Sequence, residues 1–326
     1  MSLDADQIVD RRRMRRKLTF WRVFAALFAI IAVIAIAGFL TGPDFGFAER
    51  AGDQIARISI RGLIRGDQDR TEALDELGKS HVRAVILHID SPGGTTAGSE
   101  QLHDSLRLLA SRKPMVVVVD GMAASGAYIA AMAADHIVAH DTSLVGSIGV
   151  LFQYPNVSDL LKTLGVRVEE IKSSPLKAAP NGFEPTSPEA RAAIESIVMD
   201  SYAWFRGLVQ SRRHLEGEAL DRVADGRVFT GRQALGLKLV DEIGTEQTAV
   251  AWLAKEKGIN PKTPVRDWRL RSRLGDLSFL HLGAVALDAV GLGALARRIE
   301  ESGTAQALDR LNLDGLLALW HPSPAN

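Results

Sequence analysis

The sequence predicts an α/β fold in which helices cover a mainly parallel sheet, preceded by one N-terminal transmembrane helix. Short β-branched runs alternate with helix-compatible segments, and Gly-rich turns follow two of the runs. This alternation favours parallel strands joined by crossover helices. An uncharged apolar run near the N-terminus indicates the transmembrane helix. The 326 residues suffice for one large or two modest domains with a core.

The predicted elements begin with a strand at 58–60 and end with a long helix that starts near Pro188. Ser187 supplies an N-cap side chain for that helix, Pro188 suits its first turn, and Glu189 places a negative charge there. Between these limits, strands are expected at 84–89, 115–119, 137–139 and 166–172, and helices at 71–81, 97–110, 127–134 and 157–164.

The C-terminal extension, 266–326, is rich in Leu, Ala and Gly and is expected to form packed helices. Its segment 283–296 is apolar apart from Asp288 and is too short to span a bilayer. A lid, an oligomer contact and a membrane-surface helix are the alternatives for this extension.

Composition excludes several classes of function. Lys plus Arg equals Asp plus Glu at 39 each, so net charge gives no reason to expect a nucleic-acid partner. The absence of cysteine excludes disulfides, Cys-ligated metals and a Cys nucleophile. The eight histidines form no metal-binding motif, so neither a metal nor a cofactor is expected.

The N-terminus predicts a basic cytoplasmic segment at 1–22, a membrane anchor at 23–41 and a linker at 42–54. The apolar part of the anchor is about 27 Å long at about 1.5 Å per residue, close to the thickness of a bilayer core. Basic residues precede it and acidic residues follow it, which predicts an inside N-terminus and a translocated body. A signal peptide cleaved near Ala37 is the alternative.

Two Gly-rich turns, each directly after a predicted strand, contain the candidate catalytic residues. The nine residues D-G-M-A-A-S-G-A-Y at 120–128 follow the strand at 115–119, which places Ser125 at a strand-to-helix corner. Gly93 and Gly94 follow the strand at 84–89. A serine at one corner and a glycine loop at another are the parts of a nucleophile and an oxyanion hole. The pattern therefore predicts a serine peptidase.

A serine hydroxyl needs a base, and the residues alone leave its identity open. Lys177 lies in a loop of small and apolar residues, where burial would lower the pKa of its ammonium and allow a neutral base. An exposed loop lysine is the more frequent reading of such a residue. Lys172 is the second choice, and His136 and His140, at the ends of a short strand, are the remaining alternatives.

Five ordered segments together resemble the signal peptide peptidase A (SppA) family of membrane-anchored serine peptidases. They match in order and spacing over 58–245, most of the body. The segments are I-D-S-P-G-G at 89–94, D-G-M-A-A-S-G-A-Y at 120–128, V-G-S-I-G-V at 145–150, S-P-L-K at 174–177 and R-V-F-T-G-R-Q-A-L-G-L-K-L-V-D-E-I-G at 227–244.

The resemblance implies a Ser/Lys dyad on a fold related to Clp protease and crotonase, with repeated ββα units, over 55–265. It implies that Ser125 is the nucleophile and Lys177 the general base. The supporting residues that it implies are the backbone N–H groups of Gly93 and Gly126 as the oxyanion hole, Gly94 for close approach, and Ser147 as the serine that holds the lysine.

The resemblance also implies substrates, assembly and location. The single catalytic unit is similar to the short form of the family, which implies a homo-oligomeric ring, an octamer. Apolar peptides such as remnant signal peptides are the implied substrates. The implied location is the bacterial inner membrane, with one spanning helix and the catalytic domain on the periplasmic side. The chain departs from the family at Ala178, after the lysine, and from 266 onward.

Two other functions compete with the peptidase. A crotonase-type enzyme acting on an acyl-CoA would share the fold and the oxyanion loops, but it would need neither a serine nucleophile nor a translocated body. A catalytically inactive scaffold of a membrane complex would use Ser125 only as a small structural residue. Reaction with a serine-directed covalent probe separates the scaffold from the enzyme.

Overall fold

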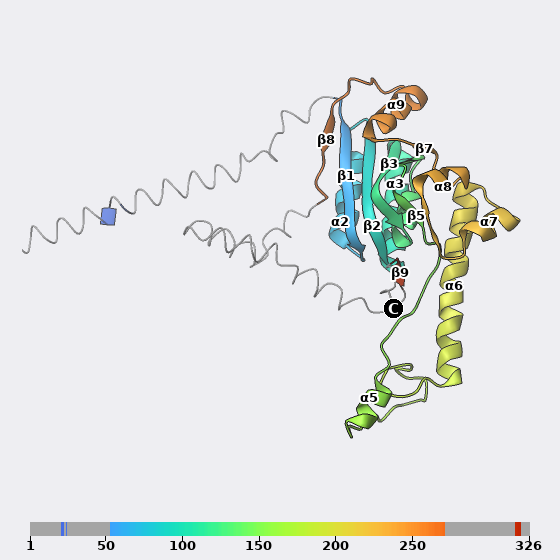
Figure 1. Cartoon of the computed structure of the whole chain (residues 1–326). Helices are drawn as coiled ribbons and strands as arrows, with labels where there is room; N and C mark the ends of the chain where they lie inside the picture. The colour runs from blue at the N-terminus through green and yellow to red at the C-terminus, as the bar shows by residue number, and fades with distance from the viewer. Residues whose placement is uncertain (1–20, 23, 25–52, 271–316, 321–326) are drawn as a thin grey trace, which may run out of the picture. The chain divides into compact units, whose positions relative to one another are not determined.

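The computed structural model describes residues 21, 22, 24, 53–270 and 317–320 (Figure 1). Residues 53–326 belong to one compact unit and residues 1–52 to another. The predicted anchor at 23–41 lies, apart from Phe24, outside the described residues, as does most of the predicted helical extension. No helix within the described ranges is both long and apolar enough to cross a membrane.

Three long parallel strands form the centre of the sheet. They are β1 (Ile55–Ile64), β2 (Ala84–Thr95) and β3 (Met115–Ala124), and β2 lies between the other two. Two shorter strands, β4 (His136–Ala139) and β5 (Leu144–Gly146), pair in parallel with successive parts of β3. The α/β class and the parallel centre of the sheet are therefore confirmed.

Four short strands extend the sheet, so that the described part of the chain forms one mixed sheet of nine strands. Two of them pair in parallel: β7 (Glu242–Ile243) with β4, and β8 (Val265–Asp267) with β1. The other two pair antiparallel: β6 (Val228–Thr230) with β5, and β9 (Leu317–Leu319) with β2. The strand β9 brings the end of the chain back to the centre of the sheet.

Helices lie on both faces of the central strands (Figure 1). On one face, α3 (Thr96–Arg112) packs against α2 (Gln68–Lys79) and against the short helix α4 (Gly126–Ala131). On the other face, α9 (Glu246–Lys257) packs against β2 and β3. The remaining helices are α5 (Ser158–Thr163), α6 (Pro188–Arg213), α7 (Gly217–Val223) and α8 (Gly231–Gly236).

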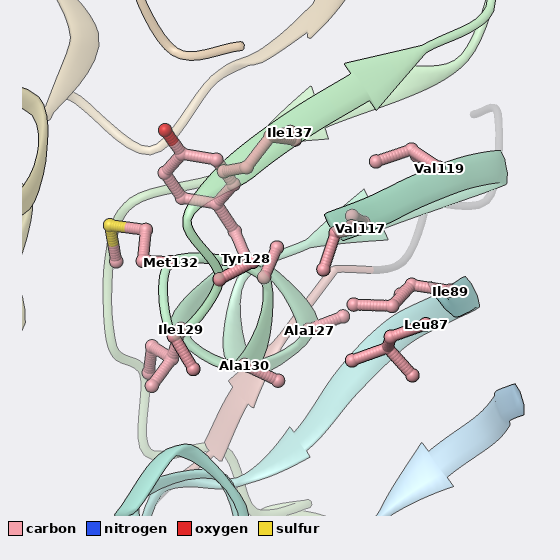
Figure 2. Packing of buried hydrophobic residues seen from close by; sticks show 14 of the residues in the cluster. Leu87, Ile89, Val117, Val119, Ala127, Tyr128, Ile129, Ala130, Met132 and Ile137 are labelled. Carbon is pink, nitrogen blue, oxygen red and sulfur yellow. The ribbon is translucent and has the colours of Figure 1, made fainter. Parts of the chain in front are cut away.

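Alternate residues of the central strands pack into two apolar cores, as the twofold period of a strand requires. Leu87 and Ile89 of β2 and Val117 and Val119 of β3 face α4 in the larger core (Figure 2). The smaller core contains their sequence neighbours Ile86, Val116 and Val118, which pack with Ala249 and Leu253 of α9. Burial on both faces explains why these strands read as unbroken apolar runs.

The long helix begins where the sequence predicts. Ser187 is the N-cap of α6, its side chain accepts a hydrogen bond from the Ala190 amide at 3.1 Å, and Pro188 occupies the first turn. The predicted strand at 166–172 is wrong, because that segment pairs with no strand of the described residues. Its alternating apolar residues are exposed, and an unpaired strand leaves its backbone groups without partners.

The hydroxyl of Tyr128 ties α4 to the segment before β7. It is fully buried and donates to the Leu239 carbonyl at 2.7 Å, and burial raises the pKa of this phenol. We expect Tyr128→Phe to lower the free energy of unfolding by about 1–2 kcal/mol, because the buried Leu239 carbonyl loses its donor. Urea denaturation of the two proteins measures the difference, and Tyr202→Phe, at a half-buried hydroxyl bound to the Ala224 carbonyl, is the control with the smaller expected cost.

Candidate active site

Ser125 lies at the junction of β3 and α4 in a backbone conformation that residues other than glycine rarely adopt. Its φ of 56° and ψ of −119° make it the N-cap of α4 without a capping side-chain bond. The Ser125 amide donates to the Gly146 carbonyl at 2.7 Å, and its carbonyl accepts from the Tyr128 and Ile129 amides at 2.9 and 3.1 Å. These three bonds hold the strained corner in place.

The side chain of Ser125 is buried without a partner. The residue is 1% exposed, and its hydroxyl makes no hydrogen bond to any described residue. The combination of backbone strain and an unpaired polar group is typical of functional residues rather than structural ones.

The strain at Ser125 can be measured without any assay of activity. We expect Ser125→Gly to raise the free energy of unfolding above that of Ser125→Ala by about 1 kcal/mol, because alanine keeps the positive φ and glycine relieves it. Urea denaturation of both variants tests this. The matched control is Ser99, in α3, where replacement by glycine should instead be less stable than replacement by alanine. Equal stability of the two Ser125 variants would contradict the strain.

The glycine corner at the end of β2 is built against β1. A Cβ atom on Gly94 would lie 1.8 Å from the Ile64 carbonyl oxygen, so no larger residue fits there. Gly93 has a φ of 103°, and its amide donates to Ser91 Oγ at 3.1 Å, while that hydroxyl donates to the Gly62 carbonyl at 2.6 Å. The Gly93 amide can therefore serve an oxyanion only when its bond to Ser91 opens.

The strand β5 brings Ser147 beside Ser125. Gly146 pairs with Ala124 in the sheet, and its carbonyl accepts from the Ser125 amide. Ser147 follows directly, with a φ of 52°, an exposure of 7% and an amide that donates to the Arg227 carbonyl at 2.8 Å. Two serines with left-handed backbones thus lie at adjacent positions of the same corner.

Lys177 lies elsewhere. It belongs to an exposed turn between α5 and α6, and its ammonium has no hydrogen-bond or ion-pair partner among the described residues. Figure 1 shows that the segment carrying α5 extends away from the sheet and that α6 leads the chain back toward it. One chain therefore brings together Ser125 and the small residues expected around it, Gly93, Gly94, Gly126 and Ser147, but not Lys177.

Two of the other candidate bases, Lys172 and His136, are engaged in structural contacts. Glu170 and Glu184 hold the Lys172 ammonium at 2.5 and 2.7 Å, and these bonds raise the pKa of Lys172, which opposes a neutral base. His136 stacks on Trp252 with ring centroids 4.7 Å apart and contacts Glu242 at 3.3 Å. Within the described ranges, no group of three or more acidic or imidazole side chains is placed to hold a metal ion.

Sequence reasoning missed Ser91 and Gly146, which position the Gly93 amide and the Ser125 amide. Both residues lie inside the motifs I-D-S-P-G-G and V-G-S-I-G-V, and their position in these motifs is the signal that could have identified them. It also missed that the end of the chain reaches this site, because Leu317–Leu319 was expected to be helical and is the strand β9. Three apolar residues carry no periodicity that separates strand from helix.

Comparison with known proteins identifies relatives. Residues 107–260 match the family described as Peptidase family S49. The putative protease slr0021 of Synechocystis is 36% identical over 210 residues, which cover 64% of this chain and 76% of that protein. The putative signal peptide peptidase SppA of Enterococcus faecium is 30% identical and covers 65% of this chain and 66% of its own length.

Among solved structures, ClpP1 from Listeria monocytogenes matches 58% of this chain and 91% of its own chain, with a TM-score of 0.37 and 16% sequence identity.

Proposed function

Because the chain belongs to peptidase family S49, the family of the SppA peptidases, we propose that it is a membrane-anchored endopeptidase that uses Ser125 and Lys177 as its catalytic dyad. The single observation that carries the proposal is the buried, strained and unpartnered Ser125. A serine in that state has no structural bond to lose and is held where a substrate carbonyl can be attacked.

The proposed reaction is acyl transfer. Neutral Lys177 removes the proton from the Ser125 hydroxyl, and the oxygen attacks the peptide carbonyl. The amides of Gly93 and Gly126 stabilise the oxyanion, and the Ser147 hydroxyl holds the lysine. Protonated Lys177 then donates its proton to the leaving amine. Water, activated by the same lysine, hydrolyses the acyl-enzyme and restores both side chains.

The position of Lys177 favours a dyad that forms between two copies of the chain. Ser125 is buried, whereas Lys177 is exposed on a segment that packs away from the sheet. Many apolar side chains are exposed together on that segment, whereas an ordinary protein surface exposes them singly. Such a concentration is typical of an interface. The exposed apolar side chains are Leu160, Leu164, Val166, Val168, Ile171, Leu176 and Phe183. We therefore place Lys177 of one copy against Ser125 of the next in a homo-oligomeric ring, an octamer.

The substrates that we propose are apolar peptides close to a membrane, such as remnant signal peptides. The predicted anchor at 23–41 and the basic residues before it support a location in the bacterial inner membrane, with the catalytic domain on the periplasmic side.

A serine-directed fluorophosphonate probe tests the nucleophile. The full chain in detergent is treated with the probe, and the modified residue is located by mass spectrometry. We expect a single adduct on Ser125 that is lost in Ser125→Ala, with Ser99→Ala, another buried serine, as the matched control that keeps the adduct. Absence of any adduct on the assembled protein would contradict the peptidase and favour the inactive scaffold.

A further inference from the structure

Arg212 binds the end of α4 that lies opposite Ser125. This arginine is in the last turn of α6, and its guanidinium donates from Nε to the Met132 carbonyl at 2.8 Å and from Nη2 to the Ala134 carbonyl at 2.9 Å. Both carbonyls belong to the turn that follows α4, and both residues are buried. Because a guanidinium is a planar fork with fixed donor directions, this one side chain fixes two points of the turn.

Two side chains of α3 bind the same end of the helix. Arg107 Nη1 donates to the Ala133 carbonyl at 2.8 Å, and the buried His103 ring bonds the Ile129 carbonyl through Nδ1, also at 2.8 Å. Nδ1 must carry a proton in this bond, since a carbonyl oxygen only accepts. Three side chains, here called the donor cluster, therefore satisfy four carbonyls at the end of α4: His103, Arg107 and Arg212.

The donor cluster holds positive charge in a place that disfavours it. Burial lowers the pKa of Arg212, the nearby Arg107 guanidinium lowers it further, and the Asp135 carboxylate raises it. Burial likewise lowers the pKa of His103. Two cations held side by side repel each other, so this end of α4 is not arranged for maximal stability. What the cluster supplies is direction, because each donor fixes a carbonyl at hydrogen-bond geometry.

The rest of α4 offers few directional contacts. Four of its six residues are glycine or alanine, and the helix packs on β2 and β3 (Figure 2). The Tyr128 hydroxyl is the one polar side-chain group in its sequence, G-A-Y-I-A-A. Small side chains interlock weakly with a sheet, so hydrogen bonds at the two ends determine where the helix lies. At the first end that bond runs from the Ser125 amide to the Gly146 carbonyl, and at the other end it is the donor cluster.

We propose that Arg212 is a positioning residue of the peptidase reaction, which holds α4 so that the Ser125 hydroxyl and the Gly126 amide meet the same substrate carbonyl. The inference rests on the proposed function, because it adds a residue on which that reaction depends. Ser125 and Gly126 are adjacent at the start of α4, so a slide or tilt of the helix displaces both relative to the Gly93 amide of β2. A displacement of about 1 Å can lower the rate about 10²-fold.

Arg212→Lys in the full chain tests the proposal, and Arg213→Lys is the matched control. Both variants keep the charge at the end of α6, but a lysine at 212 cannot bind two carbonyls as a fork. Arg213 is also half-buried, and it binds the Lys238 carbonyl and the Asp241 carboxylate instead of α4. We expect kcat for an apolar fluorogenic peptide to fall about tenfold in Arg212→Lys with little change in KM, and to change by less than about twofold in Arg213→Lys.

Urea midpoints separate positioning from stability. Both substitutions should lower the midpoint, because each removes hydrogen bonds of a half-buried arginine. The rate at which the fluorophosphonate modifies Ser125 should fall only in Arg212→Lys, by the same factor as kcat. An unchanged kcat in Arg212→Lys, or equal losses of kcat in the two variants, would overturn the positioning role.

Hydrogen exchange separates a failure of this inference from a failure of the proposed function. Exchange of the amides at 126–134, measured by mass spectrometry on the unmodified chain and the two variants, needs no substrate. We expect faster exchange there in Arg212→Lys and not in Arg213→Lys. Faster exchange in Arg212→Lys alone, without hydrolysis by any of the three proteins, would leave the hold of Arg212 on α4 standing and remove the peptidase. Equal exchange in the two variants would overturn the inference whether or not the proteins hydrolyse peptides.

Discussion

Ser125→Ala and Lys177→Ala will each hydrolyse apolar fluorogenic peptides at least about 10³-fold more slowly than the unmodified chain, because each removes one member of a unit that acts together. Lys172→Ala is the matched control, since Lys172 is ion-paired with Glu170 and Glu184, and we expect it to keep most of the activity. Activity that survives Lys177→Ala would move the base to another residue.

A loss of hydrolytic activity in these variants could also result from a change in folding or assembly, so both must be measured. Ser125 is part of the corner that joins β3 to α4, whereas Lys177 is exposed on the segment between α5 and α6. We expect Lys177→Ala to leave the urea midpoint of one chain unchanged, and sedimentation should show an unchanged assembly. A loss of activity that coincides with dissociation would instead point to a role of this residue in the interface.

Gly94→Ala will destabilise the protein by about 3 kcal/mol or more, the second large effect that we expect. A Cβ atom at this position would meet the Ile64 backbone at 1.8 Å, and backbone atoms of two paired strands cannot move apart without breaking the ladder. Urea denaturation and the yield of soluble protein measure the effect.

Gly207 provides the control for Gly94. It lies inside α6, has no left-handed φ, and a Cβ atom there would meet nothing within 4 Å. We expect Gly207→Ala to be neutral or to stabilise the protein by up to about 1 kcal/mol, because alanine favours a helix over glycine. Equal effects at the two positions would contradict the packing of β2 against β1.

The sequence was sufficient for the centre of the fold because local signals agree there. The apolar runs in β2 and β3 are buried on both faces of the sheet. Ser187 and Pro188 predict the start of α6, and the structure contains the N-cap hydrogen bond of Ser187. The same signals failed at 166–172, where alternating apolar residues suggest a strand but find no partner within the described residues. Alternation reports which side chains seek burial, not whether a neighbouring strand is available.

The candidate site, like the fold, could be predicted from the sequence only in part. Motif order predicts that Ser125, Gly93, Gly94 and Ser147 converge, and the ladder between β3 and β5 brings the two serines together. Pairings between distant segments were beyond sequence reasoning, because nothing local records them. The pairing of Leu317–Leu319 with β2 is one example. The position of Lys177, on an exposed segment apart from Ser125 of the same chain, is another relation between distant segments that no local signal records.

Activity of mixed assemblies tests the central claim most directly. Chains with Ser125→Ala and chains with Lys177→Ala are co-expressed in equal amounts, and peptide hydrolysis is compared with that of each variant alone. If Lys177 of one copy serves Ser125 of the next, random assembly restores about a quarter of the unmodified activity, since that fraction of neighbouring pairs has both residues. If the mixture is as inactive as its components while the two variants co-assemble, the dyad does not form between copies.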